Sequence, residues 1–226
     1  MQNMIDIFIN YLPELTRGLI ISLQLTVVGL VFGAIVGLFL ALAKVFGGKW
    51  TRRIAVGYIE LFRGTPILVQ LFVIYFGLPQ LGLTLSRMTS AFLVLALNSA
   101  AYQAEYFRGA IQAIGSGQMM AARSIGMTRG QAISSIILPQ AARIVIPAWS
   151  NEPISLLKAS AVVFLIAVPD LMTQAKIIAA RTYQPIDTYV IVAVFYLAIV
   201  FILTQVMVFA EKRLRIPGLE VDAQRV

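Results

Sequence analysis

Long apolar runs dominate the chain and predict helices that cross a membrane. A helix needs about 20 mostly apolar residues to span the hydrocarbon core of a bilayer. Two runs reach this length without a charged residue, and three more reach it with a few polar residues inside. The predicted spans are residues 19–43, 54–78, 88–107, 144–168 and 189–210. We therefore expect an all-α membrane protein with five transmembrane helices in a single domain, residues 1–226.

The segment before the first long apolar run allows two interpretations. Residues 2–18 mix apolar and polar side chains, as in a short amphipathic helix that lies on the membrane surface. The same residues would equally suit an extension of the first span beyond the bilayer. That span is too long and too far into the chain for a cleavable signal peptide, and no small-residue cleavage site follows it. We expect it to be retained.

Composition supports a membrane protein and excludes several kinds of chemistry. Hydrophobic residues make up 59% of the 226 residues and charged residues 12%, against about 25% charged in soluble globular chains. The absence of Cys and His excludes disulfides, thiolate or imidazole metal ligands and a Ser-His-Asp triad. A P-loop is also missing, because Ala43 and Trp50 stand where the pattern around Gly48 and Lys49 requires Gly and Ser or Thr. If the protein uses ATP, another chain must bind it.

The distribution of Lys and Arg between the loops predicts the orientation, because cytoplasmic loops of membrane proteins carry an excess of these residues. One set of loops holds most of them, namely Lys44, Lys49, Arg52, Arg53, Arg108, Arg123, Arg129, Arg143, Lys212, Arg213, Arg215 and Arg225. The opposite set holds Arg17, Arg87, Lys176 and Arg181. This asymmetry places the N-terminus outside and the C-terminus in the cytoplasm.

The longest cytoplasmic loop, residues 108–140, lies between the third and fourth spans and carries a spaced pattern. Ala121-Ala122, Gly126 and Ile136-x-Leu138-Pro139 follow the spacing E-A-A-x3-G-x9-I-x-L-P, with Met120 in place of the glutamate. This pattern resembles the EAA loop of ABC importer permeases. Any salt bridge made by the family's glutamate is expected to be absent.

Two further segments resemble the permeases of polar amino acid importers. Glu60-x-x-Arg63-Gly64-Thr65-Pro66 is similar to their E-x-x-R-G-T-P segment, and residues 151–158 followed by 169–171 are similar to a later one. The resemblance covers nearly the whole chain. It implies a multi-pass transport subunit of the cell membrane with no cofactor of its own, because a partner ATPase binds ATP and Mg.

The resemblance also implies partners. Such permeases pair as homodimers or heterodimers, receive the amino acid from an external binding protein, and each engage one cytoplasmic ATPase through the EAA loop. A coupling helix then sits in a groove of the ATPase. Its residues would be Ala121, Ala122, Arg123, Ile125, Gly126 and Met127. Without the resemblance, a short helix here would more often be a plain connector.

Polar residues at similar depth in three spans form the candidate substrate site. Polar groups inside a span are costly and mark transport pathways. Pro66 and Pro153 break two of these spans, as in transporters that bind their substrate near the midplane. Backbone amides freed near Pro153 suit a carboxylate, and Glu152 suits an ammonium group or a cationic side chain. The candidate substrate-binding residues are Glu152, Asn98, Gln70, Asn151, Pro153, Ser155, Ile67, Leu156 and Lys158.

Several of these residues also have structural interpretations. Asn98 is equally suited to bridging two helices, and the aliphatic pair Ile67 and Leu156 is more often plain packing. The charge of Lys158 suits the substrate carboxylate, the membrane interface or a partner subunit. Glu60 and Arg63, spaced i,i+3, favour a salt bridge with each other over substrate contact.

The charge of Glu152 bears on the substrate. A buried carboxylate is costly without a positive partner, which favours arginine, lysine or histidine. The α-ammonium of any amino acid would also satisfy it, so neutral polar substrates such as glutamine are the alternative. An ion-coupled secondary transporter is a less favoured class, since a carrier has no use for a docking helix. The acidic residues form no cluster suited to a metal, which argues against a membrane-embedded enzyme.

Overall fold

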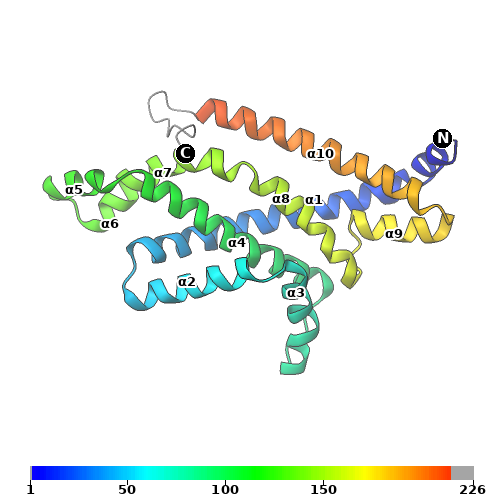
Figure 1. The fold of residues 1–226 in the computed structure, drawn as a ribbon, viewed down its shortest axis with the longest axis horizontal. Helices are drawn as coiled ribbons and strands as arrows, with labels where there is room; N and C mark the ends of the chain where they lie inside the picture. Colours follow the sequence, from blue (N-terminus) through cyan, green and yellow to red (C-terminus); the bar gives the residue numbers. More distant parts are fainter. Residues whose placement is uncertain (1, 215–226) are drawn as a thin grey trace.

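The computed structural model describes residues 2–214, and this part of the chain is helical almost throughout (Figure 1). The long helices are α1 (Gln2–Phe46), α2 (Lys49–Gly64), α4 (Arg87–Ala113) and α10 (Pro185–Leu214). The shorter helices are α3 (Ile67–Phe72), α5 (Ser116–Ser124), α6 (Arg129–Ala132), α7 (Leu138–Trp149), α8 (Glu152–Ser160) and α9 (Leu171–Thr182). Turns of π-helix at Val73–Gly77 and Ile133–Ile137 and of 3₁₀-helix at Leu78–Leu81 and Ala161–Ile166 continue the neighbouring helices.

Three to five helical stretches of the described chain can cross a membrane, judged by length and composition. Met4–Phe46, Arg129–Trp149 and Pro185–Arg213 qualify individually. Two bent pairs qualify if each pair is one span. These pairs are Lys49–Gly64 with Ile67–Leu81, bent by 105°, and Glu152–Ile166 with Leu171–Thr182, bent by 51°. The expected all-helical membrane architecture is therefore confirmed, whereas the predicted span boundaries need correction.

The corrections have physical causes. The predicted span 54–78 crosses a break at Thr65 and Pro66, whose extended backbone ends α2 and starts α3 in a new direction. The predicted span 144–168 is interrupted after Trp149, where α7 ends. Further along, part of the segment taken for an external loop forms α9 instead.

Two other helices differ from expectation in length and in polarity. The third predicted span, residues 88–107, lies inside α4, whose buried polar residues Ser90, Ser99 and Gln103 make this helix less apolar than the candidate spans. At the N-terminus, α1 is continuous from Gln2 through Pro13 to Phe46. Residues 2–18 therefore extend the first span, which was one of the two interpretations of this segment.

A stripe of glycines on α1 lets this helix approach α4 closely. Gly29, Gly33 and Gly37 recur at four-residue spacing and therefore lie on one face of the helix. A Cβ atom at Gly33 would lie 2.7 Å from Gln103 Nε2, and one at Gly37 would lie 2.9 Å from the Ala100 carbonyl oxygen. Small residues of this kind allow backbones in membranes to pack closely. The contact brings the polar face of α4 into the interior of the bundle.

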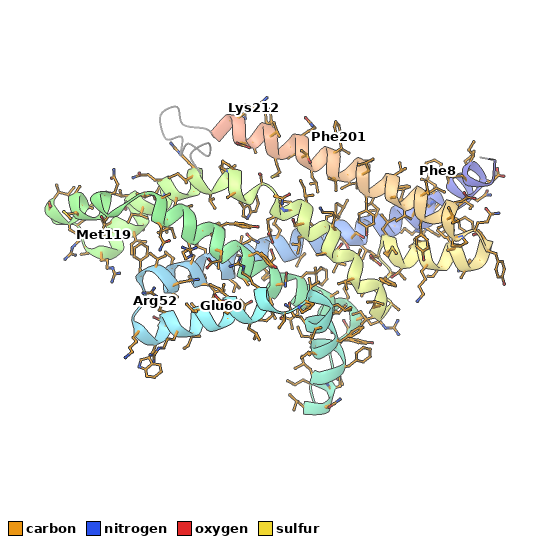
Figure 2. The ribbon with its side chains drawn as sticks, viewed as in Figure 1. Phe8, Arg52, Glu60, Met119, Phe201 and Lys212 are labelled. Atoms are coloured by element: carbon orange, nitrogen blue, oxygen red, sulfur yellow. The ribbon has the colours of Figure 1, made fainter. Side chains whose placement is uncertain are left out.

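The two ends of the bundle carry different elements. α5 and α6 lie at the end where α1 finishes, whereas α9 and the start of α1 lie at the other end (Figure 1). Met119 and Arg52 mark the first end and Phe8 the second (Figure 2). The connections predicted to face the cytoplasm, between α1 and α2 and between α4 and α7, thus meet at one end.

Candidate functional site

A cavity of about 590 Å³ lies where the breaks in the second and fourth predicted spans face α4. It opens beside the end of α2, the start of α3, one face of α4 and the first turns of α8. Its walls are formed by Arg63, Gly64, Thr65, Pro66, Ile67, Asn98, Tyr102, Tyr106, Glu152, Ser155, Leu156 and Ala159. Both helix breaks therefore contribute to a single cavity.

Glu152 is the acidic group of this cavity. Its side chain is only 4% exposed, and its Oε1 atom accepts a 2.6 Å hydrogen bond from Ser99 Oγ. Within residues 2–214 no Lys or Arg forms an ion pair with it. A buried carboxylate without a cation is costly, so the site gains stability when a positively charged ligand enters. The arrangement suits an ammonium or guanidinium group.

A chain of hydrogen bonds holds Glu152 in place from behind. Ser99, which donates to Glu152, accepts from Gln103 Nε2 at 2.9 Å. Gln103 is fully buried, and its Nε2 also donates to the Leu30 carbonyl oxygen of α1 at 3.0 Å. Its Oε1 accepts from Trp149 Nε1 at 2.7 Å. The carboxylate is thus fixed by side chains of α4 and α7 that never reach the cavity.

An amide network closes the break between α2 and α3. The Gln70 Nε2 atom donates to the carbonyl oxygens of Phe62 and Thr65 at 2.8 and 2.9 Å and to Thr65 Oγ1 at 2.9 Å. Asn98 Nδ2 donates to Gln70 Oε1 at 3.1 Å and to the Phe62 carbonyl oxygen at 3.3 Å. Helix ends leave carbonyl groups unpaired, and these two amides satisfy them. Asn98 therefore bridges helices while it also lines the cavity.

Arg63 is the basic group of the cavity. Its guanidinium lies over the Tyr102 ring at 5.5 Å and 3.8 Å from Glu105 Oε2, and it donates no hydrogen bond within the described chain. The expected partner Glu60 is exposed on α2 and forms no ion pair with residues 2–214 (Figure 2). The predicted salt bridge between Glu60 and Arg63 is therefore wrong.

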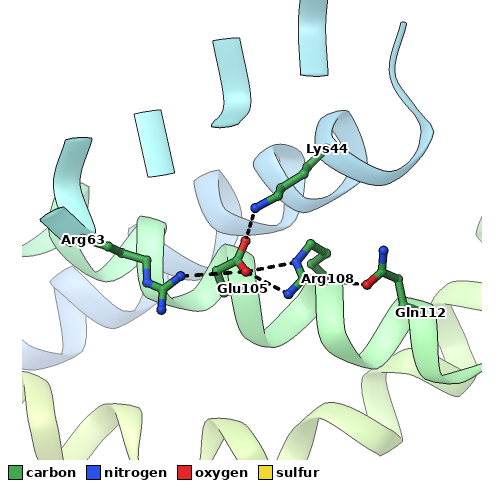
Figure 3. A network of polar contacts seen from close by, with 5 residues as sticks. All are labelled: Lys44, Arg63, Glu105, Arg108 and Gln112. Atoms are coloured by element: carbon green, nitrogen blue, oxygen red, sulfur yellow. Dashed lines mark hydrogen bonds and ion pairs between the residues drawn. The ribbon is translucent and has the colours of Figure 1, made fainter. Parts of the chain in front are cut away.

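Other cations already saturate the Glu105 carboxylate, which explains the loose contact with Arg63 (Figure 3). Lys44 Nζ lies 2.7 Å from Glu105 Oε1, and Arg108 Nε and a terminal nitrogen lie 3.0 and 2.9 Å from Oε2. Arg108 also contacts Gln112. Arg63 is the most distant of the three cations, so its five N–H donors are free for a ligand.

The structure brings five of the predicted substrate-binding residues to the cavity, namely Ile67, Asn98, Glu152, Ser155 and Leu156. The other four do not line it. Gln70 turns toward the break in α2, and Pro153 is buried in α8 away from the cavity lining. Asn151 and Lys158 are exposed and lie beyond Ser155 around the helix, because successive residues turn by about 100°.

Sequence reasoning missed Arg63 and the tyrosines of α4. Asn98, Tyr102 and Tyr106 follow one another at four-residue spacing and line the same cavity wall. That spacing was visible in the sequence once Asn98 had been selected. The role of Arg63 was hidden, because the i,i+3 spacing with Glu60 offered a simpler partner.

The EAA-like loop forms the short helix α5, which lies at the end of the bundle where α1 finishes and where the loops rich in Lys and Arg are found. α5 ends in a turn closed by Gly126, whose φ of 86° favours glycine. Ala121, Arg123 and Ile125 are exposed, as is Met120, which stands at the glutamate position. Ala122 is buried and Met127 is half-buried. Of the predicted coupling residues, these two face into the protein.

A bundle of apolar helices around a charged cavity defines a membrane transport protein of the permease class. The chain belongs to the family of binding-protein-dependent transport system inner membrane components, whose model matches residues 29–216. Together with the relatives below, this identifies a multi-pass inner-membrane permease of the polar amino acid ABC importers. The resemblance noted in the sequence is confirmed.

Individual relatives cover most of the chain. It is 38% identical to the arginine transport system permease protein ArtQ of Bacillus subtilis over 208 residues, 92% of this chain and 95% of ArtQ. It is also 38% identical to the histidine/lysine/arginine/ornithine transport system permease protein HisM of Escherichia coli over 206 residues, 87% of each. A crystal structure of an amino acid ABC transporter with histidines is 42% identical, with a TM-score of 0.85, over 91% of this chain and 96% of that one.

A more distant structure shares the fold alone. The MetNI methionine ABC transporter in an inward-facing conformation is 20% identical, with a TM-score of 0.77, and the match covers 92% of this chain.

Proposed function

We propose that this chain forms half of the membrane pathway of an ATP-driven importer for basic amino acids, and that the 590 Å³ cavity is its substrate site. The observation that carries the proposal is the pair of opposite charges on the cavity walls. Glu152 is buried without a cation, and Arg63 has no hydrogen-bond acceptor in the described chain. Free amino acids carry both complementary charges, an ammonium and a carboxylate.

The arrangement assigns a role to each wall. Arg63 binds the α-carboxylate, because a guanidinium fork matches a carboxylate in two parallel hydrogen bonds. Glu152 binds a positive group of the substrate, and Asn98 and Ser155 supply neutral hydrogen bonds. Ile67 and Leu156 pack against the aliphatic part. This assignment replaces the amides near Pro153 with Arg63 as the carboxylate site.

Basic substrates are favoured over neutral ones for two reasons. The carboxylate of Glu152 is compensated most fully by a ligand that brings an extra positive charge. Both ArtQ and HisM, which cover most of this chain, are named for basic amino acids. The neutral alternative, with glutamine as an example, uses the α-ammonium alone at Glu152.

Coupling to ATP requires other subunits. α5 presents Ala121, Arg123 and Ile125 to a cytoplasmic ATPase, which binds ATP and Mg and drives alternating access. An external binding protein delivers the amino acid. α8 has an exposed polar edge formed by Asn151, Ser155 and Lys158. Contact with a second permease subunit, either identical or related, satisfies these polar side chains better than contact with lipid does.

The substrate proposal is tested with the chain, its ATPase and its binding protein in proteoliposomes, by measuring uptake of arginine and of glutamine. Glu152→Gln removes the charge and keeps the shape. A hydrogen bond to a charged group is worth about 1.5–3 kcal/mol, so apparent affinity for arginine should fall by roughly 10- to 150-fold. Affinity for glutamine should change much less.

Glu60→Gln is the matched control, since this exposed carboxylate of α2 does not line the cavity. It should leave both substrates unaffected. Equal losses for arginine and glutamine in Glu152→Gln would refute the basic preference. An ion-coupled carrier would instead lose uptake with an uncoupler and keep it when ATP is depleted.

A further inference from the structure

The connection between α1 and α2 carries unpaired positive charge. From Lys44 to Ile59 the sequence contains no Asp or Glu. Lys44 turns inward to Glu105 at 2.7 Å. The remaining cations, Lys49, Arg52 and Arg53, are exposed and form no ion pair with any described residue. These three side chains therefore form a positively charged surface that is accessible to a ligand.

Large apolar side chains stand directly beside these cations. Trp50 is 72% exposed and Ile54 is 71% exposed, on the face of α2 opposite the buried Ala55 and Ile59. The Arg53 guanidinium lies over the Trp50 ring at 5.4 Å. We call Lys49, Trp50, Arg52, Arg53 and Ile54 the Trp50 surface.

The backbone holds the Trp50 surface firmly against the end of α1. A Cβ atom at Gly47 would lie 2.3 Å from the Ala43 carbonyl oxygen, so the turn is tight and needs glycine. Thr51 Oγ1 donates to the Gly48 carbonyl oxygen at 3.0 Å. The surface lies at the same end of the bundle as α5, where Arg52 is seen in Figure 2.

We propose that the Trp50 surface binds the headgroup of an anionic phospholipid. Lys49, Arg52 and Arg53 attract the lipid phosphate, as basic clusters beside a span attract anionic lipids. Trp50 lies at the level of the headgroups, which tryptophan prefers, and Ile54 contacts the acyl chains. A lipid fits better than a soluble protein, because the apolar face continues from Ile54 to the 60% exposed Leu61 along the span.

The chain offers a direct probe, since Trp50 and Trp149 are its two tryptophans. The full-length chain is placed in phosphatidylcholine vesicles that contain acyl-brominated phosphatidylglycerol or, at equal mole fraction, acyl-brominated phosphatidylcholine. The difference between the wild type and Trp50→Phe isolates the Trp50 fluorescence. Phosphatidylglycerol should quench it at a lower mole fraction than phosphatidylcholine.

Each basic residue near a membrane surface contributes about fivefold to binding of anionic lipid. The double variant Arg52→Gln, Arg53→Gln should therefore reduce the preference for phosphatidylglycerol roughly 25-fold. The matched control, Lys176→Gln with Arg181→Gln at the opposite end of the bundle, should leave it unchanged. Salt supplies a second test that does not depend on the charge variants. The preference of Trp50 for phosphatidylglycerol, again taken as the difference between the wild type and Trp50→Phe, should decrease between 0.1 and 1 M salt, as the screening length falls from about 10 to about 3 Å.

Three results would overturn the proposal. The first is equal quenching of wild-type Trp50 by the two lipids. The second is a lipid preference that salt does not weaken. The third is a double variant that keeps its preference but binds the ATPase less tightly, which would make the Trp50 surface a protein-docking site.

Discussion

Gly33 of α1 is the position where a single methyl group should disturb the substrate site most directly. In Gly33→Ala the new Cβ atom would lie 2.7 Å from Gln103 Nε2 and 2.9 Å from both Ser99 Cβ and Ser99 Oγ. A Cβ atom cannot form a hydrogen bond and essentially never lies this close to another heavy atom, so α1 must move away from α4 or the two side chains must shift. Ser99 and Gln103 are the residues that hold Glu152.

The expected magnitude is the sum of two opposing effects. Overpacking a close helix contact costs about 1–3 kcal/mol. Replacing a helical glycine with alanine recovers about 0.5–1 kcal/mol. Gly33→Ala should therefore destabilise the protein by about 1–2 kcal/mol. Gly109→Ala in α4 is the matched control, because nothing lies within 4 Å of its Cβ position, and it should be neutral or stabilising.

The assay compares thermal unfolding of the purified variants at one scan rate. A difference of about 2 kcal/mol between them corresponds to a Tm difference of roughly 4–8 °C for a chain of this size. Substrate-stimulated ATP hydrolysis in the complete transporter should show weaker apparent affinity for arginine in Gly33→Ala only. Equal Tm values and equal affinities in the two variants would refute the close contact and its role in supporting Glu152.

Three further variants test neighbouring features. Arg63→Gln should reduce the discrimination between arginine and its decarboxylated amine, agmatine, by at least tenfold in a competition assay, because only arginine has a carboxylate that this residue can bind. Unchanged discrimination would show that Arg63 does not bind the carboxylate. Gln70→Leu should lower stability by about 1–3 kcal/mol, measured as Tm, while the order of substrate preference stays the same. The variant removes the side-chain donor of the Thr65 carbonyl and leaves the Phe62 carbonyl only its 3.3 Å bond from Asn98. Trp149→Phe should keep the Tm within a few degrees. It should weaken the preference for arginine over glutamine in the hydrolysis assay, because it removes the hydrogen bond from the indole to Gln103. A preserved preference would show that Gln103 keeps its position without this bond.

The sequence predicted the helical membrane architecture because apolar runs report burial in lipid directly. The predicted span 88–107 lies inside α4, although buried polar residues such as Ser99 and Gln103 lower the mean hydropathy of this helix. The sequence also indicated a helix break at Pro66, but it did not predict the angle between the helices on either side of the break. At the 105° bend Gln70 bonds to the nearby carbonyl groups of Phe62 and Thr65, but Asn98 bonds to Phe62 from 36 residues away, and local sequence does not reveal this second contact.

The site was predicted in part for a similar reason. Glu152 and Asn98 stood out because polar groups are rare at membrane depth, and both line the cavity. Local spacing misled the interpretation of Arg63, since Glu60 is near in sequence but Tyr102 and Glu105 are near in space. Lys158 was also chosen for its depth, yet the cavity faces only one arc of α8.

The residues that support Glu152 connect the proposed substrate site to the end of the bundle that carries α5. Trp149, whose indole bonds to Gln103, and Met119 of α5 both pack against the same buried apolar cluster. A displacement of α5 by the ATPase would therefore act on the same packed side chains that set the indole. Because Gln103 accepts from Trp149 and donates to Ser99, a change at the indole alters the donor that faces Glu152. If Glu152 binds the substrate and α5 binds the ATPase, as we propose, a small shift in this chain of hydrogen bonds would couple ATP hydrolysis to substrate affinity.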